Sequence, residues 1–415
     1  MSGHQSRQAP ADSPARRPRV GVLVHSVYTV RFFLVPHLKM LAEQYDVFLF
    51  LKNDNDEMLR SMDLPVRVIE IPIERKVDIL ADLRALVVIA WQFRKADLDL
   101  VHTMTAKGGL LGILAGFLVR VPRRVHTFQG EIWPHFSGTK RAFFRFLDWL
   151  VVRLATDITV VSFSERDFLR AEGVLPPTAG KVLGAGSICG VDISRFAPAP
   201  ATGSKIRRDL GIRADEFVFL FLGRLSRDKG LHILSEAFER VRNQTGRPIR
   251  LLVVGPDEDD LGDGLRASLG QSVIVLPFTD RPEQYIAASD VLVLPSFREG
   301  FGMVLIEAAA MGVPAIASDI YGISCAVENH RTGLLVTVGD HEALAVAMTS
   351  LLTDAALLRR LGEQGRERSV RDFEQQTVIQ HFKCFYEASL ADPAGHDGSA
   401  SLHGTITAQD SADGG

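Results

Sequence analysis

The chain has few cysteines, no long apolar run near its start and no apolar segment long enough to cross a bilayer. Its three cysteines, Cys189, Cys325 and Cys384, are widely spaced. They form neither a metal-binding pattern nor a disulfide framework, so we expect a reducing compartment. No long apolar run precedes Val20, so no signal peptide is predicted. The longest apolar candidate, Gly108 to Val119, is too short to span a membrane and predicts a buried helix.

The chain also lacks the fingerprint of dinucleotide-binding enzymes. The first predicted strand, Val20 to Val24, is not followed by G-x-G-x-x-G, which argues against a dinucleotide-dependent dehydrogenase. No internal repeat of solenoid length is visible. With 415 residues, 46% hydrophobic and 23% charged, the composition is that of a globular protein with room for two domains.

A strand, a glycine turn and a helix follow one another in the second half of the chain. The run Asp290 to Pro295 is typical of a buried strand, and the apolar run Met303 to Met311 is typical of a helix. The turn between them contains Gly300-Phe301-Gly302. A helix N-terminus behind two glycines presents unpaired N–H groups and a positive dipole end. The turn therefore predicts a phosphate site.

Two glutamates flank this turn, with seven residues between them. Glu299 precedes the glycines, so its carboxylate is expected beside whatever group is bonded to the phosphate. Glu307 lies within the helix, where it would accept hydrogen bonds from a diol such as ribose. The alternative is an ordinary solvated pair on a loop and a helix surface. The glycine turn between strand and helix favours the functional interpretation.

A second loop contains two cations between glycines. It follows the predicted strand Phe217 to Leu222 and has the sequence GRLSRDKG, in which Gly223 is followed by Arg224 and, later, Lys229. A bound diphosphate requires fixed cations, and Arg and Lys at these positions would supply them. Two solvated loop cations are the alternative, but the G-R-L-x-x-x-K-G arrangement favours diphosphate binding.

Four polar residues of the first half fall at or beyond the carboxyl ends of predicted strands. They are His102, Lys107, Gln129 and Glu131. Ligands of open α/β sheets bind at that edge, so these residues are candidates for an acceptor side of the site. Each one, taken singly, is also explained as a polar loop residue.

The segment Thr139 to Ala155 predicts a strongly amphipathic helix. Its apolar stripe consists of Phe143, Phe146, Leu147, Leu150, Val151 and Leu154. We expect most of this stripe to pack on the core, with a membrane surface as the alternative. Residues 1–190 carry 25 Lys and Arg against 19 Asp and Glu, a net charge of +6, whereas residues 191–415 carry a net charge of −9. Attraction of the first half to an anionic surface and ordinary scatter both account for this division.

The chain divides into five predicted segments. Residues 1–17 and 391–415 are polar and predict disordered tails. Glycines between 184 and 190 and the Pro-Ala run Phe196 to Ala201 indicate a boundary and a linker. Residues 18–190 and 191–372 therefore predict two α/β domains. Residues 373–390 predict a C-terminal helix that packs back toward the first domain.

Together these motifs resemble the bacterial family-4 glycosyltransferases of capsule, O-antigen, lipopolysaccharide and exopolysaccharide biosynthesis. The resemblance covers roughly residues 18–390 and depends on VHTMTAKGGLLG, HTFQGEIW, LGAGSICGVD, FLGRLSRDKG, VVGPDEDD and VLPSFREGFGMVLIEA. It implies the GT-B fold, in which two Rossmann-like domains face each other across a cleft. The N-terminal domain would bind the acceptor and the C-terminal domain the nucleotide sugar. Two positions depart from the family: Gln129 stands where many relatives have His, and Cys189 where relatives often have Asn.

The resemblance implies a retaining transferase of hexosyl or N-acetylhexosaminyl groups. The expected donor is a UDP-sugar and the expected acceptor a sugar on undecaprenyl diphosphate. The catalytic residues would be Glu299, Arg224 and Lys229. The donor-binding residues would be Gly223, Phe278, Gly300, Phe301, Gly302, Met303, Val304 and Glu307. Because side-chain cations balance the diphosphate, no metal or other cofactor is expected, and the acidic triplets at 54–56 and 257–259 are expected to be solvated loops.

The expected partners are the nucleotide sugar, the polyprenyl-linked sugar and an anionic membrane surface, with no nucleic acid. The expected location is the cytoplasm, at the inner face of the plasma membrane. Two alternatives are a nucleotide-sugar epimerase of the same fold and a non-catalytic sugar-binding protein. The presence of both Glu299 and Lys229 argues against the second.

Overall fold

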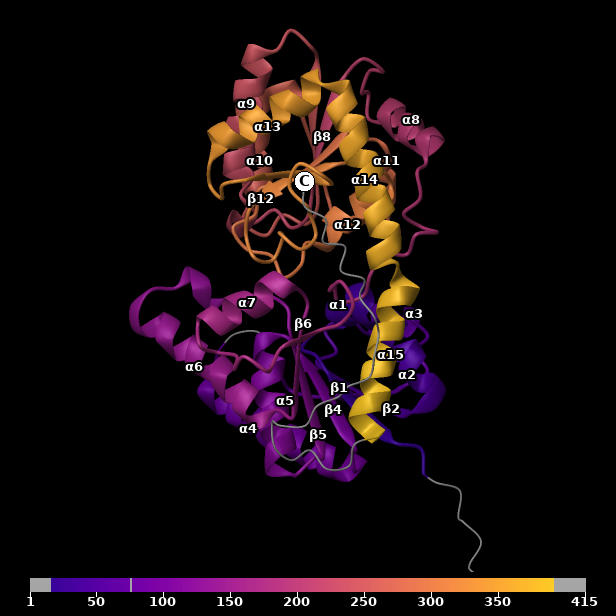
Figure 1. Cartoon of the computed structure of the whole chain (residues 1–415), viewed down its shortest axis with the longest axis vertical. Coiled ribbons are helices and arrows are strands. Elements are labelled where there is room, and N and C mark those ends of the chain that lie inside the picture. The colour runs from indigo at the N-terminus through magenta and orange to yellow at the C-terminus, as the bar shows by residue number, and fades with distance from the viewer. Residues whose placement is uncertain (1–15, 75–76, 392–415) are drawn as a thin grey trace, which may run out of the picture.

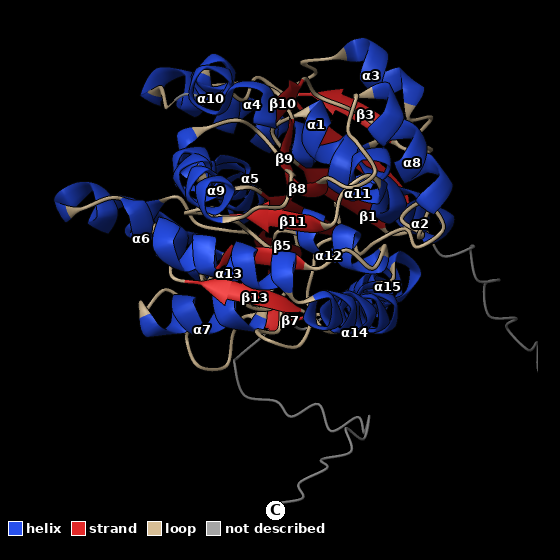
Figure 2. Cartoon of the chain, turned by 90° about the horizontal axis from the view of Figure 1, so that it is seen from above, coloured by secondary structure: helices blue, strands red, loops and turns tan. Residues whose placement is uncertain are grey.

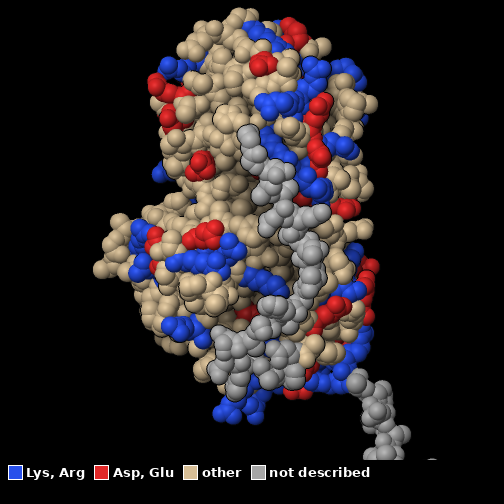
Figure 3. Space-filling view, viewed as in Figure 1, with Lys and Arg blue, Asp and Glu red and all other residues tan. Residues whose placement is uncertain are grey.

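Two parallel β-sheets, each covered by helices on both faces, form two lobes joined at a waist (Figures 1 and 3). The computed structural model describes residues 16–74 and 77–391. The N-terminal sheet has the strand order β3-β2-β1-β4-β5-β6-β7, and the C-terminal sheet has the order β10-β9-β8-β11-β12-β13. All paired strands of these sheets are parallel. The predicted α/β class is therefore confirmed.

The N-terminal lobe alternates strands and helices. Its strands are β1 (Arg19–Leu23), β2 (Asp46–Leu51), β3 (Arg67–Glu70), β4 (Leu100–Met104), β5 (Arg123–Phe128), β6 (Asp157–Val160) and β7 (Lys181–Val182). Its helices are α1 (Val27–Thr29), a π-helical turn at Val30–Leu34, α2 (Val35–Gln44), α3 (Asp56–Ser61), α4 (Ile79–Ala96), α5 (Ala106–Leu118), α6 (Gly138–Leu154) and α7 (Phe163–Ala171). The predicted buried helix over 108–119 is α5, most of whose residues are buried.

The C-terminal lobe repeats the pattern. Its strands are β8 (Phe217–Leu222), β9 (Ile249–Val254), β10 (Val273–Leu276), β11 (Val291–Leu294), β12 (Ala315–Ser318) and β13 (Gly333–Val336). Its helices are α8 (Pro200–Asp209), α9 (Leu231–Gln244), α10 (Leu261–Leu269), α11 (Pro282–Ala287), α12 (Met303–Ala310), α13 (His341–Thr353) and α14 (Ala355–Phe373). The continuous apolar sequence of β8, FVFLFL, reflects burial on both faces of a parallel sheet.

The last helix, α15 (Gln375–Ala391), crosses back to the N-terminal lobe and packs against α2 (Figure 1). Seen from above, α1, α2 and α15 lie on one side of the N-terminal sheet, and α4, α5 and α6 lie on the other (Figure 2). The two segments that cross between the lobes are hydrogen-bonded to each other. Val191 N donates to Phe373 O over 2.7 Å, and Gln375 N donates to Val191 O over 2.9 Å.

The amphipathic helix α6 differs from its prediction. We expected most of its apolar stripe to lie in the core, but Val151 is the only residue among the six that is buried. Phe143 and Phe146 are each more than half exposed. The prediction was wrong because helical spacing identifies an apolar face but does not show whether another element covers it.

The ends of the chain also differ from their prediction. Arg16, expected in a disordered tail, forms ion pairs with Asp97 and Asp99, both at 2.8 Å. The predicted linker is partly helical, since α8 begins at Pro200. Ala391 is the last residue of α15, and the remaining tail residues, 1–15 and 392–415, lie outside the described residues.

Candidate active site

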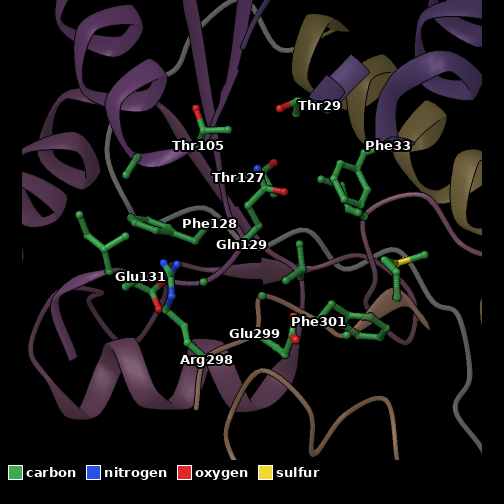
Figure 4. A pocket seen from close by; sticks show the side chains of 18 of the residues that line it. Thr29, Phe33, Thr105, Thr127, Phe128, Gln129, Glu131, Arg298, Glu299 and Phe301 are labelled. Atoms are coloured by element: carbon green, nitrogen blue, oxygen red, sulfur yellow. The ribbon is translucent and has the colours of Figure 1, made fainter. Parts of the chain in front are cut away.

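A cavity of about 590 Å³ lies between the two lobes, at the carboxyl ends of their strands. Gln129 and Glu131, which follow β5, form its N-terminal side. Arg224 follows β8, and Glu299 follows β11, on the C-terminal side. Figure 4 shows Gln129 and Glu131 opposite Glu299 and its neighbours. The carboxyl ends of the strands in the two sheets face each other across the cavity, and open α/β folds bind ligands at these ends.

The two motifs of the C-terminal lobe meet in this cavity. Lys229 Nζ forms an ion pair with Glu299 Oε1 at 2.7 Å, and the two side chains are only 13% and 15% exposed. Ser296 Oγ donates to the same carboxylate oxygen over 2.9 Å. A charge-assisted pair in such a partly dry site is stronger than a surface pair. The geometry therefore places a fixed cation next to a fixed carboxylate, as a charged and hydroxyl-bearing ligand requires.

Arg224 is held at the edge of the same cavity by acidic side chains. Its Nη1 donates to Glu258 Oε2 over 2.5 Å, and its Nη2 lies 3.7 Å from Asp228 Oδ2. Both residues of the Arg224–Glu258 pair are about one third exposed, so solvent and a competing anion reach them. Arg224 can therefore exchange its carboxylate partner for a phosphate oxygen.

We expected the acidic triplets to be solvated loops, but two of their carboxylates accept hydrogen bonds from other parts of the fold. Asp257 accepts hydrogen bonds from the N–H groups of Leu261 and Gly262 and so caps α10. Asp54 accepts from Ser26 Oγ and Val27 N at the start of α1. These carboxylates satisfy backbone and side-chain donors of the fold itself.

The glycine turn opens helix α12 toward the cavity. Gly302 is the residue before the helix and has a φ of 71°, a left-handed conformation that favours glycine. Gly300, Phe301, Gly302, Met303 and Val304 all line the cavity. The first turn of an eight-residue helix thus faces the space between Lys229 and Gln129. Its unpaired N–H groups are suited to an anion.

A second cavity, of about 840 Å³, lies beside the first and is lined by Glu307 and Phe278. The two cavities adjoin, because Val304 lines the first and Glu307, one turn further along α12, lines the second. Burial raises the pKa of Glu307 to about 7; nearby Arg195 acts in the opposite direction, and Glu283 adds to the rise. Phe278 is half exposed and contacts Phe32 of the other lobe edge to face, at 6.1 Å between ring centroids.

Two family models match the chain over most of its length. Residues 203–368 match the model of Glycosyl transferases group 1, and residues 37–186 match that of the Glycosyl transferase 4-like domain. The chain belongs to the family-4 glycosyltransferases. It is therefore an enzyme of sugar transfer.

Similar proteins cover more than three quarters of this glycosyltransferase. The capsular polysaccharide biosynthesis glycosyltransferase CapM of Staphylococcus aureus is 29% identical over 330 residues, which are 78% of this chain and 86% of CapM. The UDP-Gal:alpha-D-GlcNAc-diphosphoundecaprenol alpha-1,3-galactosyltransferase of Escherichia coli is 27% identical over 373 residues, 88% of this chain and 93% of that protein. The crystal structure of HepE from Anabaena with UDP and glucose superposes with a TM-score of 0.75 at 23% identity, covering 89% of this chain and 100% of HepE. The GT-B fold is confirmed.

Two of the four predicted acceptor-side residues of the glycosyltransferase do not reach the cavity. His102 lies inside β4 and is fully buried, with Nδ1 bonded to the Tyr386 hydroxyl and Nε2 2.6 Å from Thr127 Oγ1. Burial lowers the pKa of His102 well below its usual value. Lys107 forms an ion pair with Asp82 of α4 at 2.5 Å. His102 was misassigned because β4 extends past it and α15 covers it.

The cavity of the glycosyltransferase also contains residues that the sequence analysis missed. Arg298 lines it, next to Glu299 in the loop already singled out, so its position was the available signal. Asp148, on α6, lines it from the other lobe and accepts a hydrogen bond from Trp133 Nε1 over 2.7 Å. Burial raises the pKa of Asp148 to about 6. No local pattern indicated Asp148, because only tertiary packing turns that side of α6 toward the cavity.

Proposed function

We propose that this glycosyltransferase moves a sugar from a UDP-sugar to a sugar carried on undecaprenyl diphosphate, with retention of anomeric configuration, during synthesis of a cell-surface polysaccharide. The names of the two relatives support the pathway and the substrate classes: one is a capsular polysaccharide enzyme, and the other uses UDP-Gal and a GlcNAc on diphosphoundecaprenol. The observation that supports transfer most directly is the Lys229–Glu299 pair, set in one cavity with the α12 N-terminus and faced by Gln129.

In this proposal the C-terminal lobe holds the donor. The diphosphate would lie between Arg224, Lys229 and the first turn of α12, all of which line the first cavity. Glu307 and Phe278, in the adjoining cavity, would contact the ribose and the base. Fixed donors aimed at the diphosphate stabilise the negative charge that develops there as the sugar leaves. Glu299 would position the sugar itself.

The proposed reaction requires no protein base. The bond between the sugar C1 and the β-phosphate oxygen breaks, and a bond forms between C1 and an acceptor oxygen on the same face. The acceptor proton passes to the leaving diphosphate. Gln129, where many relatives have His, would then contact the acceptor or the donor sugar without taking this proton.

We also propose that transfer is independent of divalent metal. Arg224 and Lys229 supply the charge that a metal ion would otherwise supply to the diphosphate. The Asp257–Asp259 triplet supports this, because its members have partners: Asp257 caps α10, Glu258 binds Arg224, and Asp259 accepts from Arg227 N over 2.8 Å. Activity should therefore survive EDTA.

The test is an assay with purified protein, a panel of UDP-sugars and a short-chain lipid-diphosphate sugar. Product should form only with acceptor present, NMR of the new linkage should show the donor's anomeric configuration, and EDTA should not reduce the rate. Epimerised donor without acceptor would favour the epimerase, and binding without product a sugar-binding protein. Loss of transfer in EDTA with recovery in Mg²⁺ or Mn²⁺ would overturn metal independence.

An exposed apolar stripe on α4 supports a location at a membrane surface. Leu80, Val87 and Trp91 are 80%, 68% and 57% exposed. Ile79 and Leu83 extend the stripe at helical spacing. The exposed charged residues within α4 are Arg84, Arg94 and Lys95, and the exposed Asp97 that follows the helix is paired with Arg16 and Arg19. An apolar face bordered by cations is the composition that rests on an anionic bilayer.

Helix α6 lies on the same face of the sheet as α4, with α5 between them and in contact with both (Figure 2). Its exposed Phe143, Phe146 and Trp149 extend the apolar area, and exposed Lys140 and Arg153 its positive charge. Within residues 16–74 and 77–391, no single helix is long and apolar enough to cross a bilayer. Helices α13 and α14 reach that length and apolar content only when taken together, and they are bent by 99° relative to each other. We therefore propose peripheral binding of the α4–α6 face to the inner side of the plasma membrane, in the cytoplasm, where a polyprenyl-linked acceptor is reached.

Vesicle sedimentation tests this location. Binding should be stronger to anionic than to neutral vesicles and weaker in high salt, with each surface cation contributing about 1 kcal/mol. Val87→Glu with Trp91→Glu on α4, and charge reversal at Lys140 and Arg153 on α6, should each weaken binding. Val346→Glu is the matched control, because Val346 is 71% exposed on α13 of the other lobe. Equal binding by the α4 variant and the control would show that this face does not contact lipid.

A further inference from the structure

A chain of hydrogen bonds crosses from one lobe to the other beside the active cavity. Tyr321, which follows β12 in the C-terminal lobe, donates its hydroxyl to Glu131 Oε2 of the N-terminal lobe over 2.9 Å. Glu165, on α7, accepts from Gly130 N at 2.5 Å through one carboxylate oxygen and from Val161 N at 3.0 Å through the other. Tyr321 and Glu165 thus each bind the Gln129–Glu131 loop, which forms the proposed acceptor side of the cavity.

The two carboxyl groups of this chain are buried together. Glu131 is 3% exposed and Glu165 is fully buried. Among the described residues, no N–H or O–H group donates to Glu131 Oε1, although that oxygen is buried. Burial raises the pKa of Glu131 well above its usual value, and the neighbouring Glu165 raises it further. Burial likewise raises the pKa of Glu165, which the hydrogen bonds from Gly130 N and Val161 N and the interaction with the Glu131 side chain partly offset.

Two buried, neighbouring carboxylates repel each other unless one of them carries a proton. A proton on Glu131 Oε1 gives that oxygen a hydrogen bond to Glu165 and leaves Oε2 free to accept from Tyr321. It also leaves Glu165 ionised, so that both its oxygens accept from backbone N–H groups. One shared proton therefore satisfies every buried polar atom of the group, including the oxygen that otherwise has no partner.

The same loop touches the donor loop of the other lobe, backbone against backbone. Gly130 has a φ of 94°, and a Cβ added there would lie 2.8 Å from Gly300 Cα. A Cβ on Gly300 would collide with the carbonyl oxygen of Gln129. Tyr321 is further fixed by stacking on Phe168 of α7, with ring centroids 4.3 Å apart and an interplanar angle of 4°. The contact between the loops thus depends on glycine on both sides and on the chain from Tyr321 to Glu165.

We propose that Glu131 and Glu165 share one proton and act, with Tyr321, as positioning residues that hold the Gln129–Glu131 loop against the donor loop at Glu299–Gly300. Closure of the acceptor side onto the donor sugar then depends on this proton. A misplacement of about 1 Å at a reacting group lowers a rate by about a hundredfold, so small movements of this loop matter. The inference rests on the proposed function, since it concerns the geometry of transfer between the two lobes.

The proton makes closure sensitive to pH in one direction. Because the pKa values of both carboxyl groups are raised in the folded protein, the proton remains above the usual carboxyl range and is lost as pH rises through the raised values. Its loss leaves two charges in one buried site. The other titratable groups that face the pair are Asp148 of α6 and Tyr321 and Cys325 of the segment after β12. None of these is a cation that would compensate the second charge.

Three variants of the full-length enzyme separate positioning from folding. In Glu131→Gln an amide N–H donates to Glu165 at every pH, so the alkaline decline of wild-type kcat should disappear, whatever the turnover of the variant at neutral pH. Tyr321→Phe keeps the stacking on Phe168 but removes the donor, and Glu165→Gln removes one acceptor. Both should lower kcat about tenfold or more, with UDP affinity unchanged. Asp167→Asn, 61% exposed on the same helix, is the control.

The inference is overturned if Glu131→Gln and wild type share the same alkaline profile, or if Tyr321→Phe and Glu165→Gln retain wild-type kcat. If Glu165→Gln does not fold, the other two variants decide. The unfolding midpoint gives a readout without substrate: as pH rises, wild type should lose stability relative to Glu131→Gln, and parallel curves would exclude the shared proton. A wild-type protein that transfers no sugar would refute the proposed function alone, because this last measurement still tests the pair.

Discussion

Replacement of Lys229 by alanine tests the donor site most sharply, because this side chain has two possible roles. It forms an ion pair with Glu299 at 2.7 Å, and it lines the cavity that would hold the diphosphate. In the first role Lys229 only positions Glu299. In the second it stabilises the charge on the leaving group directly.

The two roles predict losses in different quantities, kcat for one and stability for the other. Removing one preorganised donor from a developing negative charge lowers kcat by about 10²–10³, or about 2.7–4 kcal/mol. Removing the partner of a side chain that is only 15% exposed also leaves Glu299 partly buried and unpaired, which costs about 1–3 kcal/mol of stability. Ser296, which donates to the same oxygen, limits that loss. We therefore expect a folded Lys229→Ala protein with kcat reduced at least a hundredfold.

The assay is steady-state transfer with Lys229→Ala, Glu299→Ala and the double variant. Lys205→Ala is the control, since Lys205 is an exposed lysine on α8 of the same lobe. If Lys229 contacts the diphosphate, the double variant should be slower than Glu299→Ala by at least tenfold. Equal rates for the double variant and Glu299→Ala would refute direct stabilisation and leave Lys229 a positioning residue.

Three other changes should separate the remaining roles. Arg224→Ala should lower kcat about a hundredfold with little loss of stability, because its pair with Glu258 is exposed; wild-type turnover would remove Arg224 from the site. UDP affinity should rise up to about tenfold from pH 6 to pH 8, because burial holds the pKa of Glu307 at about 7 and only the carboxylate accepts hydrogen bonds from both ribose hydroxyls. Calorimetry should show this rise in wild type and not in Glu307→Gln. Tyr386→Phe should lower the free energy of unfolding by about 1–3 kcal/mol, because His102 loses a buried hydrogen-bond partner. A fall in kcat without this loss of stability would instead support a role for His102 in acceptor binding.

Local patterns in the sequence were sufficient for the elements that form the C-terminal side of the cavity, which is the proposed donor side. The strand β8, the glycine turn at Gly300–Gly302 and the helix α12 each depend on a few adjacent residues. The spacing from Glu299 to Glu307 spans the glycine turn and the first part of α12, so it places the two residues on two adjoining cavities of the same lobe. Arg224 and Lys229 follow a strand whose apolar run is unmistakable. Short-range geometry therefore predicted most of this half of the cavity.

The N-terminal side of the cavity, which is the proposed acceptor side, was less predictable, because its geometry depends on contacts between distant residues. His102 looked like a loop residue at a strand end, but Tyr386, 284 residues later, covers it. Glu131 was a candidate by position alone, whereas its partners Glu165 and Tyr321 come from α7 and from the other lobe. A sequence lists residue types and periodicity, and it does not show which face of an element a distant segment will bury.

The amphipathic helix α6 shows the same limit. Its period of hydrophobicity determined that a helix would form there and which residues would share a face. Only the tertiary structure decided that Phe143 and Phe146 face solvent and that Asp148 faces the cavity, because the fit of α6 against its neighbours sets the rotation of the helix about its axis. The amino-acid sequence thus determined the elements and the two motifs of the C-terminal lobe by local physics, and long-range packing decided which side chains became core, surface or site.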